Sequence, residues 1–163
     1  MWQTSSELHR AAGYTVIELI VVMVLLGILS VSAMPYLGTA TGMRDDAWRD
    51  QVVTALWHAR STAVTHRRVV CVSFSATGVS LTMARSNPAS ACELSVPAPD
   101  GGSTFARSAN SAAATSVSPA GILYFQPGGR VTTALGGGTA AQWTISLQGV
   151  APVRIEGATG HVE

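Results

Sequence analysis

One ionisable side chain lies inside a long apolar segment near the N-terminus. Glu18 is followed by Leu19 to Leu29, a stretch without a polar side chain. An ionised carboxylate inside an apolar helix costs roughly 2.5–3.5 kcal/mol by insertion scales, so this position should have a positively charged partner. The nearest candidate is an amino group at Tyr14, created if the chain is cut after Gly13. Pairing with that amine on a neighbouring copy would fix the register between otherwise featureless parallel helices.

Two cysteines, Cys71 and Cys92, form a second candidate pair. Both follow the apolar segment, in the part of the chain that would be translocated, and in an oxidising compartment we expect one disulfide. Closing a loop of about 20 residues would stabilise the fold by roughly 3 kcal/mol. The alternative is two free thiols in a reduced compartment. A zinc site is not expected, because no CxxC or histidine pair at ligand spacing accompanies the cysteines.

Signatures of catalysis are missing from the sequence, which contains no GxSxG, phosphate-binding loop, HExxH or EF-hand motif. His58 and His66 are interpreted as surface or packing residues, and Trp48 and Trp57 as core and rim packing. We therefore expect no enzymatic activity, no catalytic residues, no cofactor and no metal.

Length and composition fit one domain with an appendage. The chain has 163 residues, of which 47% are hydrophobic and only 12% charged, which is too apolar for a disordered protein. The net charge of +1 gives no strong electrostatic footprint for nucleic acid or an anionic membrane.

The apolar segment is long enough to cross a membrane. A helix from Glu18 to Leu37 would be about 30 Å long, the thickness of the hydrocarbon core of a bilayer. The alternative is a secretory signal peptide cut after Ala33, because Val31-Ser32-Ala33 is an acceptable cleavage site. Glu18 favours the membrane helix, since a bare signal sequence gains nothing from a buried charge.

A second helical pattern follows the apolar segment. Apolar residues at spacings of three and four predict an amphipathic helix from about Met43 to His66. A bend is expected between Pro35 and Gly42, where proline and two glycines weaken the backbone hydrogen bonds. The predicted apolar face consists of Trp48, Val52, Ala55, Leu56, Ala59 and Ala63.

Beyond His66 the pattern alternates with a period of two, which is typical of strands. A hairpin is predicted with its turn at Ala76-Thr77-Gly78, and Asn87 to Ser118, rich in Ser, Ala and Pro, is predicted to be a long loop. The expected fold class is α+β, a long helix packed on an antiparallel sheet domain. Predicted strands cover residues 68–75, 79–84, 122–126, 130–133, 142–147 and 153–156, with a short piece at the C-terminus.

The segment from Gly13 to Leu19 (GYTVIEL) with the apolar run behind it resembles the prepilin processing motif of type IV pilins and type II secretion pseudopilins. Pro35 matches the helix-kinking proline of those proteins. The resemblance implies cleavage after Gly13 by prepilin peptidase, N-methylation of Tyr14, and the assembly role of Glu18. It also implies a leader (1–13), a membrane-spanning assembly helix (14–37), an amphipathic helix (38–66) and a globular sheet domain (67–163).

The layout of the mature chain resembles the GspH/FimT group of minor pilins and pseudopilins. The resemblance is carried by the helix, by Arg68 to Val72, and by the closing Gly160-His161-Val162. A similar cysteine pair occurs in the MSHA-type minor pilins of that group. These features imply a single-pass inner-membrane subunit with a periplasmic globular domain, which joins other pilins in a pilus or in a type II secretion pseudopilus.

DNA binding is the alternative function, because some FimT-like pilins capture DNA through a basic C-terminal G-R-x-R motif. Here the corresponding place reads Gly160-His161-Val162-Glu163, with one histidine and an acidic end. The one basic run, His66-Arg67-Arg68, is interpreted as a solvated helix end whose cations complement the helix dipole. Three such residues would give weak, salt-sensitive contacts with nucleic acid.

Overall fold

The computed structural model describes residues 14–108 and 115–163, except for the side chains of residues 32–41. It contains a long helix, α1 (Val16–His66), and the chain divides into two compact units between Thr39 and Ala40. The strands among the described residues are β1 (Val70–Ser75), β2 (Gly78–Ala84), β3 (Cys92–Ser95), β4 (Thr104–Arg107), β5 (Thr115–Ser118), β6 (Leu123–Phe125), β7 (Val131–Thr132), β8 (Trp143–Leu147), β9 (Val153–Glu156) and β10 (His161–Val162).

The strands form two antiparallel sheets in the second unit. The larger sheet has the order β3-β2-β1-β6-β7, and β4 also pairs with β2; the smaller has the order β10-β9-β8-β5. Ser75 lies opposite Gly78 in the β1–β2 hairpin, so the turn lies where the sequence predicts it. The α+β fold class is confirmed, with two sheets in place of one.

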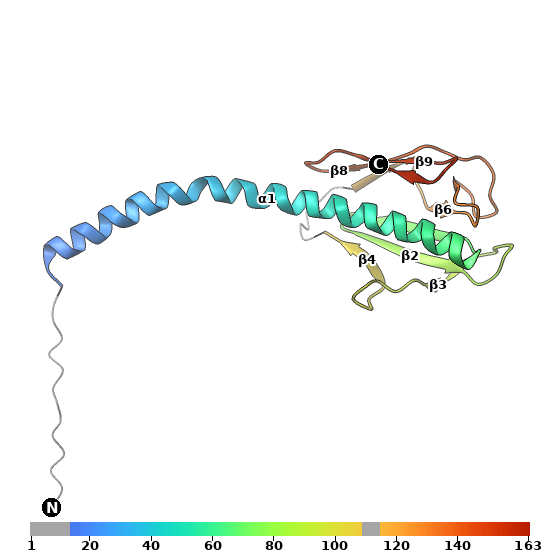
Figure 1. The fold of residues 1–163 in the computed structure, drawn as a ribbon, viewed down its shortest axis with the longest axis horizontal. Coiled ribbons are helices and arrows are strands. Elements are labelled where there is room, and N and C mark those ends of the chain that lie inside the picture. The colour runs from blue at the N-terminus through green and yellow to red at the C-terminus, as the bar shows by residue number, and fades with distance from the viewer. Residues whose placement is uncertain (1–13, 109–114) are drawn as a thin grey trace, which may run out of the picture. The chain divides into compact units, whose positions relative to one another are not determined.

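The C-terminal half of α1 buries one face in the hydrophobic core that both sheets share (Figure 1). Its buried side chains belong to one hydrophobic cluster with core residues of both sheets, such as Phe125 in β6 and Ile155 in β9. Removing one of the larger of these side chains, as in Leu56→Ala, would cost about 2–5 kcal/mol. The predicted apolar face is confirmed, because each of its members is buried: Trp48, Val52, Ala55, Leu56, Ala59 and Ala63.

The segment from Asn87 to Ser118 is not the continuous loop that its composition predicts. It contains β3, β4 and β5, four-residue strands that are too short, and too mixed with Ser, Ala and charged residues, to give a clear local strand signal. These strands exist because they pair with stronger ones: β3 and β4 with β2, and β5 with β8. The tertiary structure therefore overrides the local sequence preference here.

The backbone of α1 is helical throughout Val16–His66, including the region of the predicted bend. Pro35 belongs to residues 32–41, whose side chains lie outside the described part of the chain. Its role in a kink therefore stays a prediction.

Two glycines allow the turn between β9 and β10 to approach other backbone segments closely. A Cβ atom at Gly157 would overlap the backbone of Ala141, and one at Gly160 would overlap the carbonyl oxygen of Gly129. The amide of Val131 donates to the carbonyl of Gly157 over 2.8 Å, which links the two sheets at this point. Larger residues at either glycine would push these segments apart.

Candidate assembly site

The predicted processing site lies at the start of α1. Tyr14 lies two residues before the first residue of the helix and its side chain is 82% exposed, while Glu18 lies in the first helical turn and is also exposed. Within residues 14–108 and 115–163, no ion pair involves the Glu18 carboxylate. Gly13 lies outside the described residues. The carboxylate is thus positioned on a surface that another chain can reach.

Thr15 caps the helix that carries Glu18. The backbone amide of Glu18 donates both to the Thr15 carbonyl, over 3.1 Å, and to Thr15 Oγ1, over 3.3 Å. An N-cap threonine followed three residues later by glutamate is the capping-box pattern, although only the threonine half is formed here. Sequence reasoning missed this role of Thr15, and the T-x-x-E spacing was the signal that could have revealed it. The cap fixes Glu18 one turn inside the helix, close to the position of a new amine at Tyr14.

Glu18 is followed by a helical surface that is apolar on all sides. Every large hydrophobic side chain from Val16 to Val31 is between 47% and 79% exposed. A helix of this kind leaves an apolar surface far larger than soluble monomers tolerate, which indicates a partner or a lipid environment. No helix within the described residues has the length and hydropathy of a membrane span.

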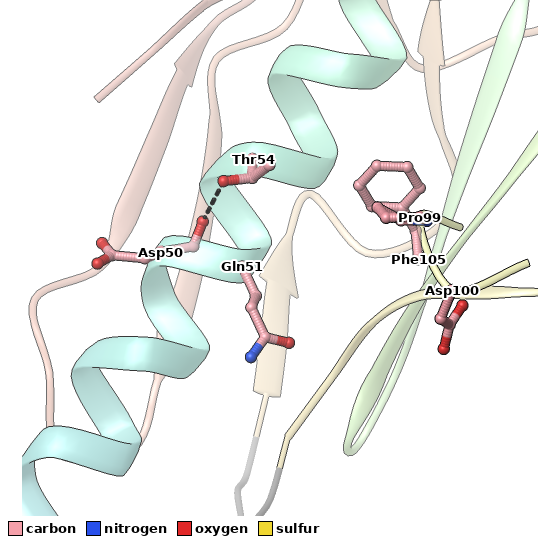
Figure 2. A pocket seen from close by; sticks show the side chains of 6 residues that line it. All are labelled: Asp50, Gln51, Thr54, Pro99, Asp100 and Phe105. Atoms are coloured by element: carbon pink, nitrogen blue, oxygen red, sulfur yellow. Dashed lines mark hydrogen bonds between the residues drawn. The ribbon is translucent and has the colours of Figure 1, made fainter. Parts of the chain in front are cut away.

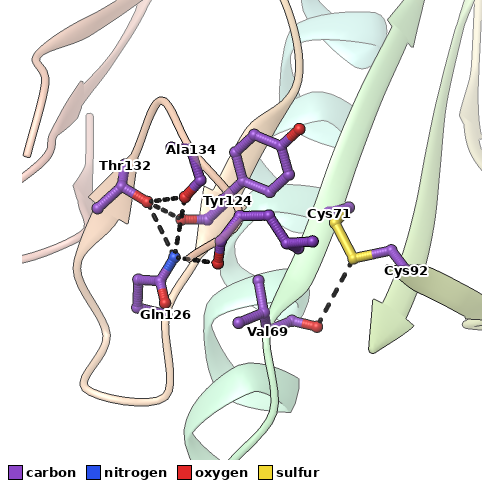
Figure 3. The surroundings of a disulfide bond; sticks show 8 residues. Val69, Cys71, Cys92, Tyr124, Gln126, Thr132 and Ala134 are labelled. Carbon is purple, nitrogen blue, oxygen red and sulfur yellow. Dashed lines mark hydrogen bonds between the residues drawn. A yellow bond between two sulfur atoms is a disulfide. The ribbon is translucent and has the colours of Figure 1, made fainter. Parts of the chain in front are cut away.

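The two cysteines lie on the face of the larger sheet that points away from α1 (Figure 3). Cys71 in β1 is bonded to Cys92, the first residue of β3, with Cα atoms 6.2 Å apart. The bond crosses over the end of β2 and packs beside Val69, Ala84 and Tyr124. It therefore ties an edge strand, which has a weak strand signal of its own, to the centre of the sheet.

Gln126 organises the loop beside the disulfide (Figure 3). Its Nε2 donates to Thr132 Oγ1 over 2.9 Å and to the carbonyl oxygen of Leu135 over 3.3 Å. Leu135 in turn packs against the cluster around the disulfide. The arrangement satisfies polar groups of a partly buried loop and contains no acid–base pair suited to catalysis.

A groove of about 370 Å³ lies between α1 and the segment leading into β4. Phe105 forms part of its wall, and His58 stacks on that ring with centroids 4.7 Å apart, which agrees with a packing role for the histidine. The Asp50 and Asp100 carboxylates point away from the ring and from each other (Figure 2). No cluster of potential metal ligands occurs among the residues that the structure describes.

The two segments that were candidates for DNA binding, His66-Arg67-Arg68 and the C-terminal stretch with His161, are part of the folded structure. The His66-Arg67-Arg68 run ends α1, and Arg67 adopts a positive φ of 53° there. The edge of the His161 ring contacts the Trp57 ring at a centroid distance of 6.1 Å. Trp57 is 42% exposed whereas Trp48 is 3% exposed, so the two tryptophans occupy the rim and the core as expected.

Comparisons with known proteins agree with the motif and the fold. Residues 8–34 match the family model of the prokaryotic N-terminal methylation motif. The fold matches the crystal structure of the type IV minor pilin FimU from Pseudomonas aeruginosa strain PAO1, with a TM-score of 0.53 and 14% sequence identity. That match covers 72% of this chain and 85% of FimU. No curated protein sequence matches. The chain therefore combines the N-terminal methylation motif with a pilin-like fold, a helix packed on antiparallel sheets.

Proposed function

We propose that this chain is a minor pilin or pseudopilin of the GspH/FimT group, of the MSHA type. Prepilin peptidase removes the leader after Gly13, and Tyr14 is N-methylated. The segment 14–37 anchors the subunit in the inner membrane, with the globular domain in the periplasm. The subunit then joins other pilins in a type IV pilus or a type II secretion pseudopilus, where Pro35 kinks the assembly helix.

The observation that carries this proposal is the Glu18 carboxylate at the start of the apolar, exposed part of α1. Leaving the carboxylate unpaired in lipid or in a fibre core is unfavourable, so an incoming subunit gains by offering a positive amine. Cleavage after Gly13 creates such an amine at Tyr14. The disulfide between Cys71 and Cys92 suits an oxidising periplasm.

The intact mass of the mature chain tests the proposal. The proposed route gives a chain that begins at Tyr14 and carries one added methyl group. Ordinary signal-peptidase cleavage after Ala33 would remove twenty further residues and add no methyl group. A mature chain that begins anywhere other than Tyr14 would exclude the pilin route.

A matched variant separates processing from folding. Gly13→Leu changes the residue before the proposed cut and no residue of the globular domain. We expect uncleaved, unmethylated protein whose globular domain still forms the Cys71–Cys92 disulfide. Cleavage at the wild-type rate in this variant would contradict a prepilin peptidase site.

A further inference from the structure

We propose that Cys92 Sγ is the sulfur at which this chain exchanges disulfides with an external thiol, and that Cys71 is the thiol that leaves and returns. A disulfide opens and closes when a thiolate attacks one of its sulfurs through a mixed-disulfide intermediate, and access helps decide which sulfur is attacked. The two sulfurs of this bond have different surroundings. Cys71 is 4% exposed in the central strand of the larger sheet, whereas Cys92 is partly exposed at the start of β3.

The side chains around Cys71 close the approach to its sulfur. An attacking thiolate approaches a disulfide sulfur from the side opposite the second sulfur. For Cys71 that side holds Tyr124, which lies directly opposite Cys71 in the pairing of β1 with β6. Figure 3 shows Tyr124 and Cys92 on opposite sides of Cys71. Leu135 packs against the same cluster, so the folded sheet shields Cys71 Sγ from an external thiol.

Cys92 lies at the outer edge of the same sheet. Among the residues that the structure describes, β3 pairs with β2 alone, so its second edge has no strand partner. The neighbouring Glu93 and its salt-bridge partner Arg85 expose 56% and 70% of their side chains. A thiol that approaches β3 from solvent therefore meets Cys92 before any other part of the bond.

The exchange balances through one intermediate. In the oxidising direction, the Cys92 thiolate attacks the disulfide of a protein or small-molecule oxidant, forms a mixed disulfide with it and expels the oxidant's second thiol. The Cys71 thiolate then attacks Cys92 Sγ, so the internal bond forms and the oxidant leaves reduced to two thiols, which carry two electrons and two protons. Reduction retraces these steps with an external thiolate. It expels the Cys71 thiolate among apolar side chains, which is unfavourable, so the surroundings of the bond favour closing over opening.

Trapping the intermediate with glutathione tests this site. The folded, detergent-solubilised full chain is exposed to reduced glutathione, quenched with acid, blocked with N-ethylmaleimide and cleaved with trypsin. Cys71 lies in the tryptic peptide 69–85 and Cys92 in the peptide 86–107. We expect glutathione on peptide 86–107 about tenfold more often than on peptide 69–85, and about equal labelling of the two peptides after unfolding in urea.

A matched pair of variants tests the shielding. Tyr124→Ala uncovers Cys71 Sγ and should raise the labelling of peptide 69–85 several-fold. Phe105→Ala truncates another partly buried ring, which packs in the main core and not beside the disulfide, and should leave the preference for peptide 86–107 unchanged. Equal labelling of the two peptides in the folded parent chain, a preference for peptide 69–85, or no glutathione on either peptide would overturn the inference. The exchange site belongs to the globular domain and does not depend on the proposed function.

Discussion

Arg60 donates a hydrogen bond from its Nε to the carbonyl oxygen of Thr159 over 3.2 Å, across 99 residues of sequence. The bond joins α1, near its C-terminal end, to the turn between β9 and β10. Its side chain also lies near Gly129 and Gly160, so one arginine holds the C-terminal hairpin against the helix.

Arg60→Met should destabilise the globular domain by about 1–2 kcal/mol. The apolar stem of the side chain is retained, whereas the hydrogen bond to Thr159 is lost. Urea unfolding of the detergent-solubilised full chain measures the change. Arg130→Met, at an exposed position, serves as control and should remain within about 0.5 kcal/mol of the parent chain.

Gly157→Ala should destabilise the fold by about 2–3 kcal/mol or prevent folding, because the new Cβ overlaps the backbone of Ala141. Gly136→Ala is the matched control, since a Cβ there meets no atom within 4 Å. Thermal unfolding compares the two variants. Equal melting temperatures would show that the 140–141 segment can move aside without cost.

Arg67→Gly should stabilise the protein by about 0.5–1 kcal/mol. Arg67 follows the last residue of α1 with a φ of 53°, and the amide of Arg68 donates to the carbonyl of Ala63 to close the helix end. Glycine adopts this left-handed conformation without the Cβ penalty. Arg67→Ala also removes the charge but keeps a Cβ atom, and with it the strain of the positive φ. Comparing the two variants therefore separates the effect of the strain from the effect of the charge. A gain from alanine equal to that from glycine would contradict the explanation by backbone strain.

Removing the disulfide should lower the free energy of unfolding by roughly 3 kcal/mol, since it closes a loop with a sequence separation of 21. The double variant Cys71→Ala with Cys92→Ala avoids a stray thiol, and denaturant titration measures its stability. Addition of a reductant should destabilise the parent chain and leave the double variant unchanged. A parent chain that is insensitive to the reductant would show that the bond contributes little.

Glu18→Leu should leave cleavage after Gly13 intact while lowering incorporation into fibres about tenfold or more, because the incoming amine then has no carboxylate partner. Immunoblots of sheared fibres and of whole cells measure the incorporated fraction. Ser30→Ala, a small change further along the exposed part of α1, should assemble normally. Normal assembly of Glu18→Leu would refute the proposed pairing.

The sequence by itself predicted the elements that depend on local pattern. The spacing of Trp48, Val52 and Leu56 identified the buried face of α1, and alternation identified the β1–β2 hairpin. The motif around Glu18 could also be identified from the sequence, because an ionised carboxylate within an apolar run is unfavourable whatever fold the rest of the chain adopts. Such signals need no knowledge of distant segments.

Tertiary structure alone decided the features that depend on distant partners. Strands β3, β4 and β5 form on partners elsewhere in the chain, and Gly157 is required only because Ala141 packs against it. The division into two sheets and the contact of Arg60 with Thr159 likewise join segments far apart in sequence. Weak local preferences leave such segments undetermined until long-range pairing offsets the entropy of ordering them.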